Sequence, residues 1–199
     1  MFVLTIDQRG STHASDEVPA LLDALTETSP TALLLPYERT VGDEVQGLLV
    51  DAATVVETVL RIAGRGGWSV GLGIGSVREP LPGSTREATG DAYVRARDAV
   101  DRAKGRGLTV PLAVTGADEE RAHDTEAFLR LLAAVVARRS TAGHDAVAAL
   151  RRVGGTQKEA AAELGISEQA MSQRLRAALH DEVEAARPVA VRMLQEADG

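Results

Sequence analysis

Residues 156–178 constrain the fold more strongly than any other stretch of this chain. Ala160 and Leu164 lie at a spacing that gives a helix one apolar face. Gly165 can adopt the left-handed conformation that ends a helix in a tight turn. Ser167 is a favourable N-cap for a following helix, because its hydroxyl can accept a hydrogen bond from the backbone. The pattern therefore predicts a helix, a sharp turn and a second helix.

The second helix has its own apolar face, formed by Met171, Leu175 and Ala178. Ile166 is expected to fill the corner between the helices, and small alanines in the first helix allow a close crossing. This pattern is typical of the helix-turn-helix, which places its second helix in the major groove of DNA. An ordinary helical hairpin with a solvated polar face would share part of the pattern. The joint fit of these residues favours double-stranded DNA as the partner.

The remaining side chains of the second helix point away from its apolar face. Polar groups there can contact base edges, and arginines can contact phosphates. The net charge of the chain is -7, so any contact with DNA has to be local and oriented. The candidate DNA-binding residues are Ser167, Glu168, Gln169, Ser172, Gln173, Arg174 and Arg176.

The composition limits the rest of the molecule. A length of 199 residues suits one domain of usual size and a small appendage. Aromatic residues make up only 3% of the chain, so its core must consist of Val, Leu, Ile and Ala. The chain has no cysteine, which excludes disulfides and thiolate metal sites and is consistent with the cytoplasmic location that we expect. No apolar run approaches the ~20 residues of a membrane span, and the apolar start is predicted to be a strand rather than a signal peptide.

The predicted order of elements over residues 1–115 is strand, helix, strand, strand, helix, strand, helix, strand. We expect an α+β domain with the helices on one face of a single sheet, as in a ferredoxin-like fold. Residues 116–140 are predicted to form a connector helix. Such helices often supply a dimer interface, so a homodimer is expected. Residues 141–199 are predicted to form an all-α helix-turn-helix domain, closed by a helix that Pro188 bends or interrupts.

Two local patterns refine the sheet. Gly42 and Asp43 separate two extended runs and predict a hairpin. Residues 68–77 alternate glycine with large apolar side chains, which predicts a strand with close backbone neighbours.

Four segments resemble the class III nucleotide cyclase domain. Asp7–Thr12 is similar to the Asp-x-x-Gly-(Ser/Phe)-Thr turn of that family, and Glu38–Asp43 is similar to its Lys-Thr-Ile-Gly-Asp segment. Val70–Gly75 and Thr89–Arg97 resemble two later family motifs in the right order. The resemblance covers residues 2–114. Together with the C-terminal helix-turn-helix, this combination resembles the SatD-like family.

The resemblance implies a site for magnesium and a nucleotide. It makes Asp7 and Asp43 metal ligands, and carboxylates at a strand end and on an adjacent hairpin can converge on hard cations. It places a triphosphate on the turn after the first strand and puts Arg39 where the family often has a base-selecting Lys. The candidate nucleotide-binding residues are Arg9, Gly10, Ser11, Thr12 and Arg39.

The chain departs from the family where catalysis would be completed. The Asn and Arg that orient the ribose and stabilise the transition state fall, in ungapped register, on Val94 and Asp98. No catalytic residue is therefore assigned, and binding without turnover is favoured over an active cyclase. In a purely structural interpretation, Asp7 caps its loop, and Gly42 and Asp43 form an ordinary hairpin turn.

The sequence thus favours a DNA-binding transcriptional regulator whose cyclase-like domain senses a ligand or dimerises. Two alternatives stay open. One is a divergent metal-dependent nucleotidyl cyclase or related nucleotide-binding enzyme with a regulatory tail. The other is a module in which both halves only mediate protein assembly.

Overall fold

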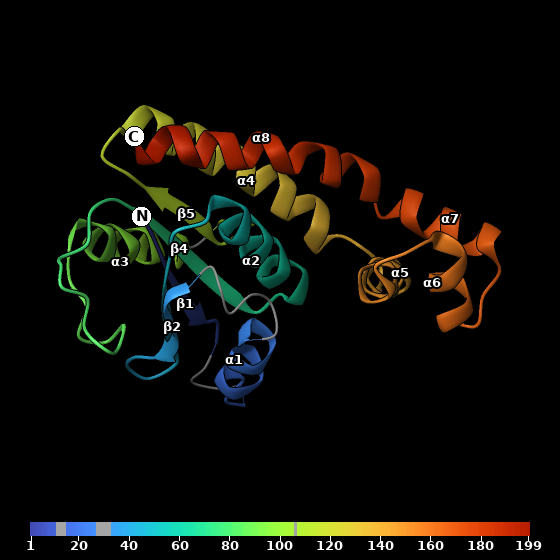
Figure 1. Cartoon of the computed structure of the whole chain (residues 1–199), viewed down its shortest axis with the longest axis horizontal. Coiled ribbons are helices and arrows are strands. Elements are labelled where there is room, and N and C mark those ends of the chain that lie inside the picture. Colours follow the sequence, from blue (N-terminus) through green and yellow to red (C-terminus); the bar gives the residue numbers. More distant parts are fainter. Residues whose placement is uncertain (11–14, 27–32, 106) are drawn as a thin grey trace.

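The computed structural model describes residues 1–10, 15–26, 33–105 and 107–199. A mixed sheet and its helices form one end of the molecule, and a group of short helices forms the other (Figure 1). The strands are β1 (Phe2–Gln8), β2 (Leu33–Arg39), β3 (Glu44–Leu49), β4 (Trp68–Ile74) and β5 (Leu112–Thr115). The helices are α1 (Val18–Thr26), α2 (Ala52–Arg65), α3 (Asp91–Ala103), α4 (Glu119–Ala137), α5 (Thr141–Val153), α6 (Gln157–Glu163), α7 (Glu168–Ala177) and α8 (His180–Asp198).

The sheet has the strand order β2-β3-β1-β4-β5. Neighbouring strands are antiparallel except β4 and β5, which are parallel. The expected mixed α+β class is therefore confirmed. The predicted hairpin is also confirmed, because β2 and β3 pair as neighbours and Gly42 takes a positive φ of 62° in the turn between them.

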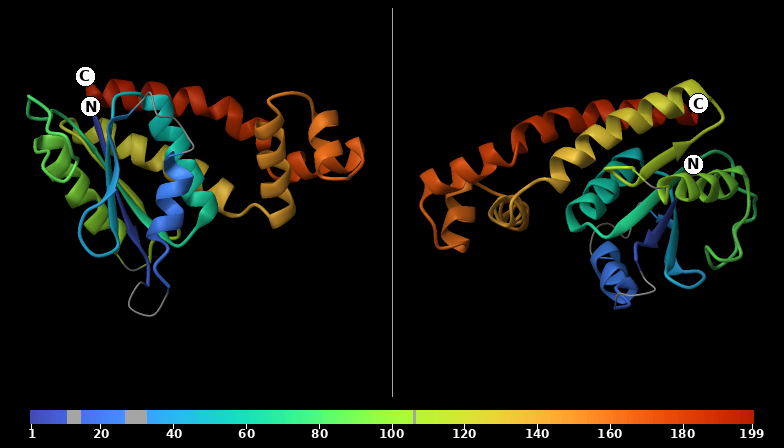
Figure 2. Two further views of the ribbon diagram at one scale, coloured as in Figure 1. Left: turned by 60° about the horizontal axis from the view of Figure 1, so that its bottom comes forward. Right: turned by 180° about the vertical axis from the view of Figure 1, so that it is seen from behind.

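Both faces of the sheet are buried. In β1, Phe2, Leu4 and Ile6 belong to one apolar core, whereas Val3 on the other face belongs to a second core. Helices α1, α2, α4 and α8 contribute to the first core, and α3 covers the opposite face. Figure 2 shows α3 and α2 on either side of the sheet. The expectation that all helices lie on one face was wrong.

The physical reason lies in the chain crossovers. Strands β3 and β4 are parallel to each other, because both are antiparallel to β1. The crossovers through α2 and α3 advance across the sheet in the same direction but lie on opposite faces, so they have opposite hands. Two right-handed crossovers that advance in the same direction would place both helices on one face of the sheet. Because ~98% of such crossovers are right-handed, the general preference predicts a single helical layer.

Glycines in β4 allow α3 to approach the sheet at backbone distance. A Cβ atom added at Gly71 would lie 2.2 Å from the backbone nitrogen of Val100. One added at Gly73 would lie 2.0 Å from the carbonyl oxygen of Ala92. The prediction of close backbone neighbours along this strand is thus confirmed, and α3 is the neighbour.

Helices α4 and α8 pack against each other in an antiparallel pair and extend the core of the sheet. Arg121 at the start of α4 donates to the carbonyl oxygen of Glu196 at the end of α8 at 2.6 Å. The amino group of Met1 forms an ion pair with Asp198, so the two ends of the chain lie together (Figure 1). The packing therefore groups α4 and α8 with the sheet rather than with the short helices, across the expected boundaries at residues 115 and 140. Within the described ranges, no helix combines the length and apolarity needed to cross a bilayer.

Replacing Gly73 by alanine should destabilise the fold by about 1–3 kcal/mol or more, because the new methyl group would overlap the backbone of α3. Urea unfolding measures the loss. Gly83→Ala is the matched control, because a Cβ atom there meets nothing within 4 Å, and it should change stability by less than ~0.5 kcal/mol. Equal stability of the two variants would contradict the close approach of α3.

Candidate nucleic-acid interface

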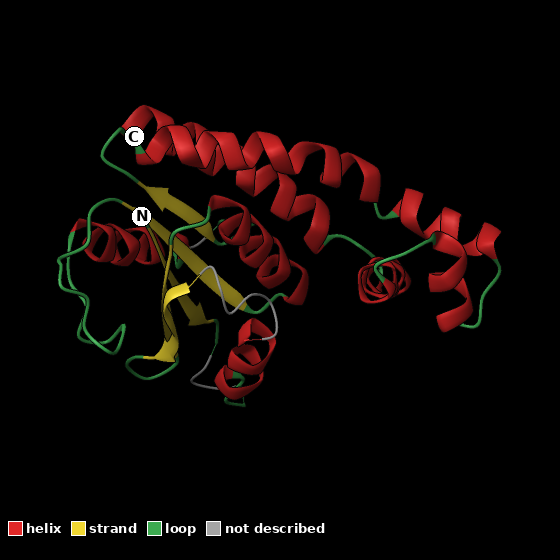
Figure 3. Cartoon of the chain, in the orientation of Figure 1, coloured by secondary structure: helices red, strands yellow, loops and turns green. Residues whose placement is uncertain are grey.

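Helices α5, α6 and α7 form a compact unit with its own small core. We call this unit the helix-turn-helix body. Its core contains Ala146, Ala160, Met171 and Leu175, which are buried together. Figure 3 shows the three helices joined by short loops at the end of the molecule away from the sheet. The predicted apolar faces of α6 and α7 are therefore confirmed.

A capping box fixes the start of α6. The hydroxyl of Thr156 accepts from the backbone nitrogen of Glu159, and the Glu159 carboxylate accepts from the backbone nitrogen of Thr156 at 2.7 Å. The backbone N–H and the hydroxyl of Thr156 both donate to the Glu159 carboxylate. These hydrogen bonds lower the pKa of Glu159. This cap was not predicted from the sequence, although a Thr followed three residues later by a Glu is its usual signal.

The turn between α6 and α7 has the predicted form. Gly165 takes a φ of 64°, and the backbone nitrogen of Ile166 donates to the carbonyl oxygen of Ala161 at 3.0 Å. Such a bond closes the end of a helix that terminates in a left-handed residue. The hydroxyl of Ser167 accepts from the backbone nitrogen of Ala170 at 3.1 Å and caps α7. Ile166 packs, partly buried, against the core of the helix-turn-helix body.

The outward side of α7 carries the candidate DNA-binding residues. Gln169, Ser172, Gln173 and Arg176 follow helical spacing and share one face. All of them except the half-buried Ser172 are exposed. Ser167 and Glu168 are exposed at the start of the helix, and Arg174 lies half-buried at the flank. The structure therefore brings the predicted residues together on one accessible surface.

The helix-turn-helix body has less unpaired positive charge than the sequence indicated, because glutamates neutralise two of its arginines. Arg151 pairs with Glu57 and Glu184, at 2.9 and 3.2 Å. Arg152 pairs with Glu163 at 2.5 Å. Among the described residues, the basic side chains of the α6–α7 region that have no carboxylate within ion-pair distance are Lys158, Arg174 and Arg176. The positive charge left for a partner thus lies mainly on α7.

The predicted metal ligands occupy a different place, on the sheet. Asp7 lies within β1, in register with Glu44, and its carboxylate pairs with Lys104 at 2.7 Å. Burial raises the pKa of Asp7, the Lys104 hydrogen bond opposes this shift, and the carboxylates of Asp43 and Glu44 add to it. Asp43 precedes Glu44, the residue opposite Asp7 in the sheet. Lys104, which binds Asp7, was not predicted from the sequence.

The surroundings of this pair do not fit a magnesium site. An ammonium group rather than an open position faces Asp7, and magnesium requires several oxygen ligands. Throughout the described part of the chain, no group of three or more His, Cys, Asp or Glu residues is placed to hold a metal ion. Magnesium binding accordingly stays a prediction without structural support.

Of the predicted nucleotide-binding residues, the structure describes Arg9, Gly10 and Arg39. Arg39 binds the Asp16 carboxylate at 2.7 Å and so ties the hairpin to the segment before α1. Gly10 has a φ of 73°, and the exposed Arg9 donates its backbone N–H to Gly67 at 2.9 Å. Ser11 and Thr12 lie outside the described residues.

The catalytic positions of the cyclase resemblance lie on α3. Val94 and Asp98 are exposed. Arg95 turns toward the sheet and donates to the carbonyl oxygen of Ile74 at 2.7 Å, whereas Arg97 is exposed. Arg95 thus has a structural partner, and these two arginines do not form a joint phosphate site.

Comparison with known proteins supports the helix-turn-helix alone. A protein-family model described as "Bacterial regulatory protein, Fis family" matches residues 147–177. The match starts within α5 and covers α6 and α7, which indicates a DNA-binding transcriptional regulator. No curated protein and no solved structure matches the chain. None of these findings supports the SatD-like resemblance or a cyclase-like domain in residues 2–114.

Replacing Ser167 by alanine should lower stability by about 1 kcal/mol, because α7 loses its N-cap hydrogen bond. Thermal unfolding measures this loss. Ser172→Ala makes the same chemical change within the helix and should be neutral or stabilising by up to ~0.5 kcal/mol, because alanine has the higher helix propensity. A larger loss for Ser172→Ala than for Ser167→Ala would contradict the capping role.

Proposed function

We propose that this protein is a transcriptional regulator that binds double-stranded DNA through α7. The observation that carries the proposal is the exposed polar face of α7 within a correctly capped helix-turn-helix. The match of residues 147–177 to the Fis-family regulatory protein supports it independently.

In this proposal α7 enters the major groove, as the second helix of a helix-turn-helix does. Gln169 and Gln173 can hydrogen-bond base edges, because an amide matches the donor and acceptor pattern of adenine. Arg174 and Arg176, near the end of the helix, are suited to phosphates, which position a protein without selecting a sequence. Ser167, Glu168 and Ser172 complete the contact surface.

The sheet domain, by which we mean residues 1–115, is proposed to sense a ligand or to dimerise. Its first four strands have the order β2-β3-β1-β4, and α1 and α2 lie on the same face. This arrangement supports the ferredoxin-like assignment. The cyclase-like assignment continues to rest on the sequence motifs alone.

A homodimer is part of the proposal, because two helix-turn-helix bodies would contact half-sites one DNA turn apart, ~34 Å. Sedimentation of the protein with and without bound DNA tests this part. A single copy on each DNA site would contradict it.

Replacing Gln173 by alanine should reduce affinity for a specific site by about 1–3 kcal/mol and relax sequence preference at the contacted base pair. The sites are first obtained by capturing genomic fragments with the unaltered protein, and affinities are then measured by fluorescence anisotropy. Val94→Ala on the far side of the sheet domain is the control and should leave affinity unchanged. Unchanged binding by Gln173→Ala and Arg176→Ala together would remove the assignment of α7 as the DNA-reading helix.

Replacing Arg176 by glutamine should weaken binding to all sequences alike and should reduce the slope of log affinity against log salt by about 1, because one phosphate contact is lost. Arg97→Gln removes the same charge from α3 and should keep the original slope. The phosphate role of Arg176 is refuted by equal slopes in the two variants.

A further inference from the structure

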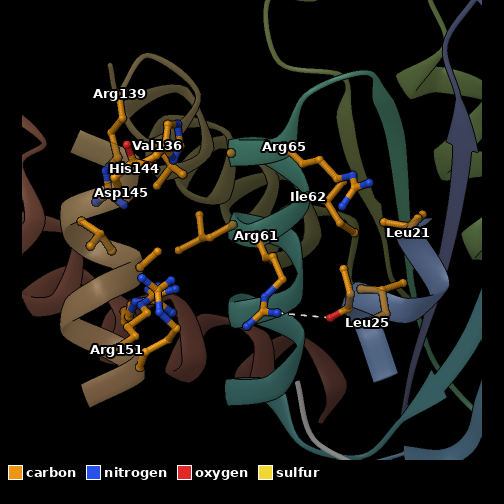
Figure 4. A pocket seen from close by; sticks show the side chains of 17 residues that line it. Leu21, Leu25, Arg61, Ile62, Arg65, Val136, Arg139, His144, Asp145 and Arg151 are labelled. Atoms are coloured by element: carbon orange, nitrogen blue, oxygen red, sulfur yellow. Dashed lines mark hydrogen bonds between the residues drawn. The ribbon is translucent and has the colours of Figure 1, made fainter. Parts of the chain in front are cut away.

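A cavity lies between the sheet domain and the helix-turn-helix body. It has a volume of about 560 Å³, within the ~300–1,000 Å³ range typical of small-molecule sites. Its walls come from α1, α2, α5 and α8, and from the end of α4 with the residues that follow it. Figure 4 shows Arg61 and Arg65 on α2, and Arg139, His144 and Arg151 on the side of α5.

This cleft is strongly basic in a protein whose net charge is negative. Asp145 is the one carboxylate among its described lining residues. Arg151 and Arg187 share Glu57 and Glu184, and Arg152 pairs with Glu163. Within the described chain, Arg61, Arg65 and Arg139 have no carboxylate at ion-pair distance. The cleft therefore holds cationic charge that no described acidic side chain neutralises.

Arg139 shows this excess of positive charge in the cleft most clearly. Its Nε donates to the carbonyl oxygen of Ala178 at 2.8 Å, but its buried Nη2 has no hydrogen-bond partner. Burial lowers the pKa of Arg139, and the nearby Arg151 lowers it further. An unpaired buried donor is costly, and a charged one more so. A bound anion would satisfy such a donor and reduce the repulsion between the arginines.

The floor of the cleft is apolar. Leu21, Leu25, Ile62 and Val136 line it. A simple inorganic ion would leave this surface uncovered. A ligand that carries both a dianionic phosphate and an apolar ring system would use both parts, because arginine binds phosphate in forked geometry and also stacks on planar rings.

We propose that this cleft binds a small organic phosphate monoester with a planar ring, such as a nucleoside monophosphate. The site is separate from the Asp7 and Asp43 region and does not depend on it. Because its walls belong to both the sheet domain and α5, the ligand would bias the position of the helix-turn-helix body. This last consequence rests on the proposed DNA-binding function, whereas ligand binding itself does not.

Isothermal titration of the full-length protein with AMP, with GMP and with inorganic phosphate tests the proposal directly. We expect saturable binding of a nucleotide that is tighter than binding of phosphate. Arg65→Gln changes an exposed residue at the end of α2 and should weaken nucleotide binding roughly ten-fold or more. Arg97→Gln, on the other face of the sheet, should bind as the unaltered protein does. Circular dichroism confirms that each variant is folded.

The outcomes separate the possible sites. Loss of binding in Arg39→Gln but not in Arg65→Gln would place the nucleotide at the hairpin and overturn the proposal. Absence of saturable nucleotide binding would also overturn it, and phosphate bound as tightly as nucleotide would overturn the role of the apolar floor. DNA titrations with and without AMP form a separate arm, so a failure of DNA binding is distinguishable from a failure of the ligand site.

Discussion

The antiparallel packing of α4 against α8 determines where the helix-turn-helix body lies. The chain leaves the sheet domain through α4, forms the helix-turn-helix body and returns through α8 (Figure 1). Val183, Ala190 and Leu194 of α8 are buried in the same core as the strands. Thr125 of α4 donates to the carbonyl oxygen of Arg121 within its own helix and lies 3.4 Å from the carbonyl oxygen of Met193 in α8. The helix-turn-helix body is therefore held at two chain connections, rather than hanging from a single linker.

Between those connections, a network of ion pairs joins α5 to α2 and α8. Glu57 of α2 binds Arg151 of α5 and Arg187 of α8, and Glu184 joins the same network. The apolar core of the helix-turn-helix body is separate from that of the sheet. The side chains of Arg151 and Glu184 are 38% and 39% exposed, and ion pairs at a protein surface contribute only ~0–1 kcal/mol each, so the contact of α5 with this network can change without unfolding either core.

Features set by neighbouring residues were predictable from the sequence. Gly165 and Ser167 act within one turn of their own helices, and the hairpin at Gly42 joins adjacent strands, so local chemistry was sufficient. The alternating glycines of β4 indicated a close neighbour but could not identify α3, because the choice of face depends on the hand of a crossover. The pairing of Asp7 with Lys104 joins residues far apart in sequence, and no local pattern predicts it. For the same reason, the sequence did not show that distant glutamates neutralise Arg151 and Arg152.

These distant pairings change how an acidic protein with a helix-turn-helix should approach DNA. Acidic side chains neutralise the arginines of α5, and the exposed arginine on the outward face of α7 stays available. A net charge of -7 repels the DNA backbone from most of the surface. Non-specific binding depends almost entirely on phosphate contacts, so it should be weak here. In the DNA complex that we propose, the amides of α7 would discriminate between sequences, because general electrostatic attraction adds little affinity.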